Sequence, residues 1–356
     1  MAADTPSTYS WPDLTAALLR REDLTAQQVQ WAMSEVMTGS APSIALAGFL
    51  IALRAKGETV TEVRALADVM LAHAVRVVVP GETLDIVGTG GDRSNTVNIS
   101  TMSALVAAGA GVRVVKHGNR AASSTSGSAD VLEALGVDLD IPAEEVGHIA
   151  EKLGITFCFA TKHHPSMRFA AEARGGLRVG TAFNVLGPLT NPAQTTYAAV
   201  GAADAAMAPI IAGVFAERDR SAAVFRGDDG LDELTLTGTS TLWWVRDGEV
   251  SSHTVAPEEV GLTRAGIEAL RGGDAESNAG VAREVLAGKP GPVRDAVLFN
   301  AGAALAVVGG TAGHDRDEIV QAIFAGIERA AAAIDSGAAG HVLDRWVAHT
   351  RGTSGD

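Results

Sequence analysis

The sequence predicts an α/β protein with a mainly parallel central sheet flanked by helices and a smaller all-helical domain. Three observations support this fold class. Residues 10–76 contain successive helical patterns with no strand pattern between them. From Leu84 onward, strand-like and helix-like runs alternate, as they do in parallel sheets covered by helices. The chain of 356 residues is also long enough for two domains.

Four short helices are expected at the start of the chain. Their boundaries are indicated by the capping-box spacing of Thr25 and Gln28, the glycines Gly39 and Gly57, Pro42-Ser43 before a helix that ends near Lys56, and Thr61 at the start of the last helix. We place an N-terminal helical domain at residues 1–78. It could stand as a small domain or serve as a face for a second subunit.

The α/β domain is expected over residues 79–350. Its predicted strands are residues 84–87, 112–115, 155–159, 197–200 and 222–225, and the helices between them are residues 103–110, 129–135 and 206–217. Residues 243–245 and 249–250 flank an Asp-Gly turn and predict a hairpin. Alanine-rich helices over 294–334 close the domain, and residues 351–356 are expected to form a frayed tail.

Composition narrows the class of partner. A net charge of −14 argues against broad binding to nucleic acid or anionic membranes, so an anionic substrate needs a local basic pocket. Cys158 is the only cysteine, which excludes an internal disulfide and fits a reducing compartment. The first ten residues lack the features of a signal peptide, and the longest apolar stretch, residues 44–53, is short for a membrane span. We therefore expect a cytoplasmic protein.

Two segments after predicted strands look like phosphate-binding loops. Residues 88–91 contain three glycines, which let backbone N–H groups turn toward a ligand without a Cβ in the way. Residues 116–124 bring Lys116, His117 and Arg120 together with several hydroxyls, although solvated surface charge is the alternative. Ligands of parallel sheets lie beyond the carboxyl ends of the strands, so both segments belong at one edge.

Two further segments could carry chemistry. Ser100 or Thr101 would lie near a helix N-terminus, where N–H groups favour anions, although plain N-capping is an equal explanation. Residues 228–233 hold four carboxylates after a strand. Asp232 and Glu233 could bind Mg²⁺, weakly without substrate, because this ion prefers oxygen ligands and often takes substrate phosphates. The commoner meaning of such a run is an acidic surface turn.

Taken together, the chain resembles the anthranilate phosphoribosyltransferase family over nearly its whole length. The motifs that carry the resemblance are Gly88-Thr89-Gly90-Gly91-Asp92, Asn98-Ile99-Ser100-Thr101, Lys116-His117-Gly118-Asn119-Arg120, His164-Pro165-Ser166-Met167, Phe183-Asn184-Val185-Leu186-Gly187-Pro188-Leu189-Thr190-Asn191-Pro192 and Gly227-Asp228-Asp229-Gly230-Leu231-Asp232-Glu233. Each is weak alone, but their order and spacing are highly specific.

The resemblance implies transfer of the 5-phosphoribosyl group from phosphoribosyl pyrophosphate (PRPP) to the amine of anthranilate, with release of pyrophosphate, in L-tryptophan biosynthesis. It implies Mg²⁺ as cofactor, as two ions bound together with PRPP. It also implies a helical domain joined to the α/β domain by a segment near residues 172–195, and a homodimer formed through the helical domain.

The resemblance also implies roles for individual residues. Those expected to contact PRPP are Gly88, Gly91, Asp92, Thr96, Asn98, Ile99, Ser100, Thr101, Lys116, His117, Gly118, Asn119, Arg120, Ala121, Ala122, Ser123, Ser124 and Ser128. Gly88, Asn119 and Arg174 would contact anthranilate, and Ser100, Asp232 and Glu233 would serve Mg²⁺. No residue is expected to act as acid or base, because the neutral aromatic amine is already nucleophilic.

One departure from the family pattern and two rival functions stay open. Gly175 and Gly176 follow Arg174 in a stretch that is normally helical, so Arg178 could replace Arg174 if the segment shifts. A nucleoside phosphorylase of similar fold would share the glycine loop and the lysine region. A non-catalytic regulator that binds PRPP as a signal would share the fold.

Overall fold

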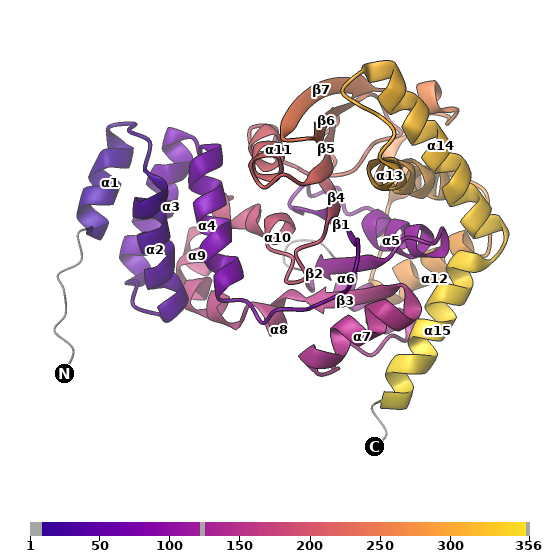
Figure 1. Ribbon diagram of the computed structural model, residues 1–356, viewed down its shortest axis with the longest axis horizontal. Helices are drawn as coiled ribbons and strands as arrows, with labels where there is room; N and C mark the ends of the chain where they lie inside the picture. Colours follow the sequence, from indigo (N-terminus) through magenta and orange to yellow (C-terminus); the bar gives the residue numbers. More distant parts are fainter. Residues whose placement is uncertain (1–8, 122–124, 354–356) are drawn as a thin grey trace.

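The protein is described by a computed structural model that covers residues 9–121 and 125–353 (Figure 1). One seven-stranded sheet has the order β3-β2-β1-β4-β5-β6-β7. Neighbours from β3 to β5 pair in parallel, whereas β6 and β7 are antiparallel, which confirms the predicted mainly parallel sheet. The strands are β1 Leu84–Gly88, β2 Val114–Gly118, β3 Ile155–Phe159, β4 Tyr197–Gly201, β5 Ser221–Gly227, β6 Ser240–Arg246 and β7 Glu249–Val255.

Four helices precede the sheet and form a bundle at one side of the molecule (Figure 1). They are α1 Trp11–Leu19, α2 Ala26–Thr38, α3 Ser43–Lys56 and α4 Val60–Ala72. Thr25 and Gln28 form the predicted capping box. The last helix begins at Val60 and not at Thr61, because Thr59 and Glu62 form a second capping box that the sequence reading missed.

Helices cover both faces of the sheet. α5 and α13 lie on one face and α11 packs on the other, against β5, β6 and α4 (Figure 1). The longer helices after β1 are α5 Ile99–Gly109, α6 Ser128–Leu135, α7 Ala143–Leu153, α11 Ala208–Glu217, α12 Ala275–Leu286, α13 Pro292–Gly309, α14 Arg316–Asp335 and α15 Ala338–Thr353. The shorter ones are α8 Ala160–His163, α9 Ala171–Leu177 and α10 Leu186–Leu189, with 3-10 turns at Pro165–Ala170, Ala182–Asn184, Pro257–Val260 and Ile267–Leu270.

The strands alternate their side chains between two hydrophobic cores. Leu84 and Ile86 of β1 point into the core under α5 and α13, while Val87 joins the core that continues into the helical bundle. The chain returns to the bundle after β3, where the 3-10 turn Pro165–Ala170 packs on α2 and α9 packs on α3. This return brings α9 to the side of the sheet where the glycine loop lies.

Several boundaries differ from the sequence prediction. β2 begins two residues later than expected and extends to Gly118, so Lys116 and His117 belong to a strand and not to a loop. The predicted tail is also wrong in part, because α15 continues to Thr353 and Arg351 Nε donates to the Gly136 carbonyl at 3.2 Å. The sequence reading also missed α12 and α15, whose patterns are broken by glycine and polar residues.

α13 is longer than the apolar stretch at residues 44–53. By length and composition alone it could cross a membrane, but 67% of it is buried inside the fold. It packs against β4, α5 and α14. This burial is that of a core helix.

Candidate active site

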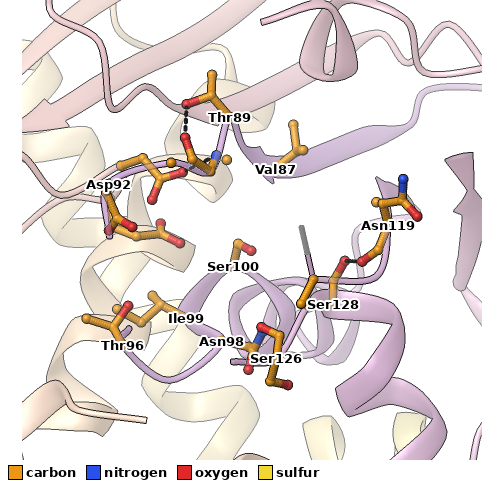
Figure 2. A pocket seen from close by; sticks show the side chains of 18 of the residues that line it. Val87, Thr89, Asp92, Thr96, Asn98, Ile99, Ser100, Asn119, Ser126 and Ser128 are labelled. Carbon is orange, nitrogen blue, oxygen red and sulfur yellow. Dashed lines mark hydrogen bonds between the residues drawn. The ribbon is translucent and has the colours of Figure 1, made fainter. Parts of the chain in front are cut away.

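A cavity of about 340 Å³ lies beyond the carboxyl ends of β1 and β2 (Figure 2). Its walls come from the glycine loop after β1, the start of α5, the end of β2, the start of α6 and the segment between β5 and β6. The sequence predicted that two of these segments, the glycine loop and the segment from Lys116, meet at one edge of the sheet. A parallel sheet presents its ligand site at this edge because the loops after several strands converge there.

The glycine loop and Asp232 are in direct contact. The Gly90 N–H donates to Asp232 Oδ2 at 2.7 Å. Gly88 and Gly201 are paired in register on β1 and β4, and both lie against Asp232. A Cβ at Gly88 would lie 2.4 Å from Asp232 Oδ2, and one at Gly201 would lie 1.6 Å from the Asp232 carbonyl oxygen. Only glycine at these two positions lets the acidic segment reach the loop.

Three carboxylates face the same cavity. Asp92, Asp232 and Glu233 line it together. Loss of hydration and then the Asp92 charge raise the pKa of Asp232 to about 6. Burial and then the Asp232 charge raise the pKa of Glu233 well above its usual value. The cavity therefore presents hard oxygen donors whose charged forms are disfavoured by burial and by one another.

The four carboxylates of residues 228–233 divide into two pairs with different partners. Asp228 accepts from the Thr241 hydroxyl at 3.3 Å, and Asp229 accepts from the Thr235 hydroxyl at 2.7 Å. These exposed residues shape the turn, as the acidic-turn alternative requires. Asp232 and Glu233 face the cavity, as the metal alternative requires. The sequence analysis named Asp232 and Glu233 as the metal candidates, and the structure places this pair, and not Asp228 and Asp229, on the cavity.

Lys116 is buried and reaches across the sheet edge. Its Nζ donates to the Ile86 carbonyl and to Ser100 Oγ, the latter at 3.3 Å. Burial lowers the pKa of Lys116, and the negative charges of Asp85, Glu233 and Asp232 oppose that shift. Lys116 is therefore a cation that acts directly on the acidic group.

His117 does not add positive charge, contrary to the sequence interpretation. Burial lowers its pKa to about 3, and burial lowers the pKa of His164, whose ring centroid lies 5.2 Å away, to about 4. His117 Nδ1 lies 2.9 Å from the Gly187 carbonyl, which fixes the proton on that nitrogen. His117 Nε2 and His164 Nδ1 have no hydrogen-bond partner among residues 9–121 and 125–353. Both rings are neutral and offer a lone pair.

Arg120 also differs from the expectation. Its side chain is exposed and bonded to α6, with NH1 3.1 Å from Asp130 and NH2 2.7 Å from Glu133. The residue still lines the cavity through its position after β2. Asp130 also accepts from the N–H groups of Ala121 and Gly127 at 2.9 Å each, so α6 anchors both ends of this loop.

A second cavity of about 350 Å³ adjoins the first on the side of the helical bundle. The residues that line both cavities are Val87, Gly88, Thr89, His117, Gly118, Asn119, Arg174 and Asn184. The second cavity has an apolar wall formed by Met70, Met167, Phe183, Leu186 and Pro188. One space is therefore polar and charged, and the other is suited to an aromatic ring.

Arg174 lies where the two cavities meet. It is exposed and has no ion-pair partner in the part of the chain that the structure describes. Arg178 is not among the described residues that line either cavity. Gly175 and Gly176 remain helical within α9, so the segment does not shift in the way that would favour Arg178.

Most of the predicted PRPP contacts line the first cavity. They are Gly88, Gly91, Asp92, Thr96, Asn98, Ile99, Ser100, Lys116, His117, Gly118, Asn119, Arg120, Ala121 and Ser128. Thr101 does not line it and is buried in α5. Ala122, Ser123 and Ser124 lie outside the described residues.

Sequence reasoning missed several lining residues. They are Thr89, Gly90, Arg93, Asn95, Ser126, Gly127 and Asn184. Thr89 and Gly90 belong to the motif Gly88-Thr89-Gly90-Gly91-Asp92, so they could have been included among the predicted PRPP contacts. Asn184 belongs to a different segment, and its position depends on the return of the chain to the bundle.

Comparison with known proteins places the chain among glycosyl transferases. The family described as "Glycosyl transferase family, a/b domain" matches residues 80–340, and "Glycosyl transferase family, helical bundle domain" matches residues 12–74. The anthranilate phosphoribosyltransferase of Nocardioides sp. is 61% identical over 96% of this chain and 99% of its own length.

Solved structures give the same result. The crystal structure of anthranilate phosphoribosyltransferase from Thermus thermophilus is 41% identical, covers 95% of this chain and 99% of its own, and has a TM-score of 0.88. The enzyme from Saccharomyces cerevisiae in complex with PRPP and Mg is 26% identical over 96% of this chain and 98% of its own, with a TM-score of 0.85. The yeast enzyme is also known in complex with 4-fluoroanthranilate, at 26% identity over 96% of this chain and 99% of its own, with a TM-score of 0.84.

Proposed function

The chain belongs to the anthranilate phosphoribosyltransferase family, and from this premise we propose how its residues bind and activate the two substrates. The activity is transfer of the 5-phosphoribosyl group of PRPP to anthranilate in tryptophan biosynthesis. The observation that carries the proposal is the contact between the Gly90 amide and Asp232 in one cavity. This contact joins a diphosphate-binding loop to a pair of metal-binding carboxylates.

PRPP occupies the first cavity in this proposal. Amides of the glycine loop and of the start of α5 face its diphosphate, and Lys116 adds a positive charge. The predicted PRPP contacts that line the cavity keep that role. The difficult step is departure of pyrophosphate while positive charge grows at the ribose C1. Preorganised N–H groups favour this step because they need not reorient as charge develops on the leaving group.

Mg²⁺ fits the oxygen donors of this site. Ser100, Asp232 and Glu233 would hold it, as two ions bound with PRPP, and the ions would neutralise charge on the leaving diphosphate. Among residues 9–121 and 125–353, no group of three or more His, Cys, Asp or Glu is arranged to hold a metal by itself. This arrangement suits an ion that takes part of its shell from substrate phosphates.

Anthranilate occupies the second cavity in this proposal. Arg174 binds its carboxylate, with two parallel N–H bonds as the favoured geometry. Asn119 and Gly88 lie between the two substrates. His117 and His164 line this space and are neutral, so they add no positive charge beside the amine. The amine needs no strong base.

Domain closure aligns the amine with C1 and excludes water as a competing nucleophile. The proposed moving parts are residues 1–78 and 79–350, joined near 172–195. Ion pairs from Arg64 to Glu217 at 3.0 Å and from Arg218 to Asp68 at 2.6 Å connect the bundle with α11.

We also propose a homodimer formed through the helical bundle and a cytoplasmic location.

Loss of anthranilate fluorescence tests this function. The protein is mixed with Mg²⁺, PRPP and anthranilate, and fluorescence should fall only when all three are present. Phosphorolysis of thymidine or uridine in place of this reaction would indicate a nucleoside phosphorylase. PRPP binding without turnover would indicate a regulator.

A further inference from the structure

Strands β1 and β2 separate at their carboxyl ends. β1 and β2 are paired in register only at Leu84 and Val114. In contrast, β1 pairs with β4 through all five of its residues. The Leu84 N–H donates to the Arg113 carbonyl at 2.9 Å, which sets the start of the parallel ladder. A continued ladder would join the Ile86 N–H to the Val115 carbonyl and the His117 N–H to the Ile86 carbonyl.

Side chains take the place of these backbone bonds. Asp85 Oδ1 accepts from the His117 N–H at 3.0 Å. Asn191 Nδ2 donates to the Val115 carbonyl at 2.7 Å and to Asp85 Oδ2 at 2.8 Å. Lys116 Nζ donates to the Ile86 carbonyl. Three of the four backbone groups left by the open ladder, the His117 N–H and the carbonyls of Val115 and Ile86, therefore have a side-chain partner.

Asp85 and Asn191 are buried, at 1% and 5% exposed, and neither lines the two cavities as the described residues define them. Asn191 is itself fixed, because its Oδ1 accepts from the Ala193 N–H at 2.9 Å. The last three residues of β2, which come after the Val115 carbonyl that Asn191 binds, do line the first cavity: Lys116, His117 and Gly118. The pair thus acts on the site through the strands and not through a substrate.

We propose that Asp85 and Asn191 are positioning residues that hold β1 and β2 apart and thereby free the Ile86 carbonyl to seat the Lys116 ammonium. Without them, the His117 N–H can bond to the Ile86 carbonyl and complete the ladder. Lys116 then loses that anchor, and the strand ends approach each other across the cavity. The inference rests on the proposed role of Lys116 in PRPP binding.

A double-mutant cycle tests this role. The variants are Asp85→Asn, Lys116→Met and their combination, with kcat/KM for PRPP measured in Mg²⁺. Asp85→Asn keeps the shape but sets an amide group against the Asn191 amide. We expect Asp85→Asn to lower kcat/KM about tenfold in the wild-type chain. In the Lys116→Met chain it should change kcat/KM by less than about threefold, because the anchored group is already absent.

Glu62→Gln is the matched control, because Glu62 is a buried carboxylate that also accepts two backbone N–H bonds but lies in the bundle. Its effect should combine additively with Lys116→Met. If Asp85→Asn does not fold, Asn191→Ala enters the same cycle. The inference would be overturned if the loss of kcat/KM from Asp85→Asn or Asn191→Ala added to that from Lys116→Met. It would also be overturned if Lys116→Met left kcat/KM unchanged. An inactive wild-type protein would instead reject the proposed function.

Discussion

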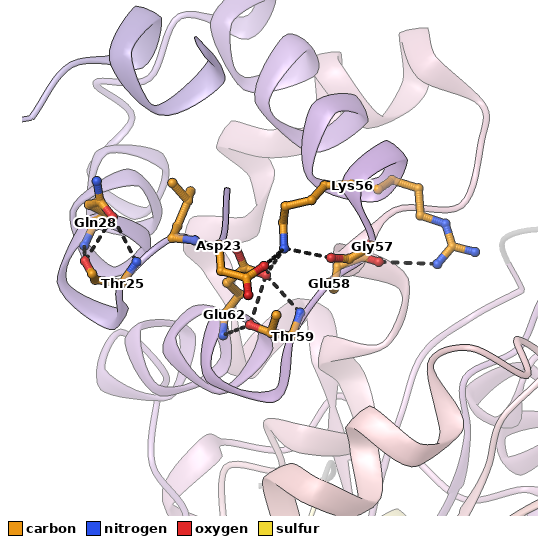
Figure 3. A network of polar contacts seen from close by, with 10 residues as sticks. Asp23, Thr25, Gln28, Lys56, Gly57, Glu58, Thr59 and Glu62 are labelled. Carbon is orange, nitrogen blue, oxygen red and sulfur yellow. Dashed lines mark hydrogen bonds and ion pairs between the residues drawn. The ribbon is translucent and has the colours of Figure 1, made fainter. Parts of the chain in front are cut away.

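Two groups of shielded carboxylates in this molecule differ in how their charge is balanced. In the bundle, Glu62 is fully buried and accepts from the N–H groups of Leu24 at 2.9 Å and Thr59 at 2.8 Å (Figure 3). Lys56 Nζ lies 2.9 Å from the same carboxylate. At the sheet edge, Asp232 accepts from the Gly90 N–H and has the carboxyl groups of Asp92 and Glu233 as neighbours, with no ion-pair partner of its own among the described residues.

The difference separates a stabilising site from a functional one. The Glu62 carboxylate is hydrogen-bonded and paired, so it strengthens the packing of α2 to α4. Burial and neighbouring negative charge raise the pKa values of Asp232 and Glu233, so the charged forms of these groups oppose folding until a cation arrives. Raised pKa values caused by burial and like charge are typical of binding and catalytic sites. Residue type alone does not distinguish the two groups; their partners do.

The largest expected effect comes from removing the charges at the sheet edge. Asp232→Asn with Glu233→Gln should lower kcat by roughly 10³-fold, because leaving-group charge is no longer neutralised. The melting temperature without Mg²⁺ should not fall, since the repulsion is gone. Kinetics at saturating Mg²⁺ and thermal unfolding measure both effects. Asp228→Asn, an exposed acid in the same run, is the control and should keep its activity. Near-normal rates in the double variant would refute the role.

The next largest effect concerns anthranilate. Arg174→Ala should raise the anthranilate KM about tenfold to hundredfold, as expected for loss of a charged hydrogen bond, and should leave the PRPP KM nearly unchanged. Arg178→Ala is the control one helical turn away and should behave like the wild type. Initial rates with each substrate varied in turn give both constants. Equal changes for the two substrates would show that Arg174 does not act on anthranilate alone.

A smaller effect, on stability, is expected for the Glu62 carboxylate in the helical bundle. Glu62→Gln should lower the free energy of unfolding by about 1–3 kcal/mol, because the buried Lys56 ammonium loses a charged partner. Chemical denaturation measures this change. Well below the melting temperature, kcat and both KM values should match the wild type. A specific rise in the PRPP KM would mean that the bundle network also serves the site.

The smallest effect is a pH dependence of stability without metal. The folded-state pKa of Asp232 is about 6, above its ordinary 3.8, so its charged form destabilises the fold above pH 6 and the penalty disappears as the pH falls toward 4. Neutral His117 and His164 act in the opposite direction, because their pKa values are lowered. The melting temperature of Asp232→Asn with Glu233→Gln, minus that of the wild type, should therefore shrink from pH 7.5 to 5.5. A constant difference would contradict this charge account.

Local patterns were sufficient for much of the fold. Capping residues, β-branched runs and the Asp-Gly turn predicted elements that depend on near neighbours, and the hairpin of β6 and β7 is one example. Glycine spacing and hydroxyl-rich segments predicted which strand ends carry the site. The resemblance to a family, and not periodicity, assigned substrates to these segments.

Long-range partners could not be predicted. The sequence does not show that His117 is neutral, because its pKa depends on burial of a ring that lies against the Gly187 carbonyl of α10. It does not show that Arg120 turns to Asp130 and Glu133, because α6 must first be placed. Asp85 stood unnoticed inside a predicted strand, since its role depends on Asn191, 106 residues away in the chain.

The central claim is that Asp232 and Glu233 join Mg²⁺ to the diphosphate held by the glycine loop. Calorimetric titration of PRPP into the protein, with and without Mg²⁺, tests it most directly. Mg²⁺ should tighten PRPP binding by about tenfold or more in the wild type and should have little effect in Asp232→Asn with Glu233→Gln. The same enhancement by Mg²⁺ in both proteins would contradict the account.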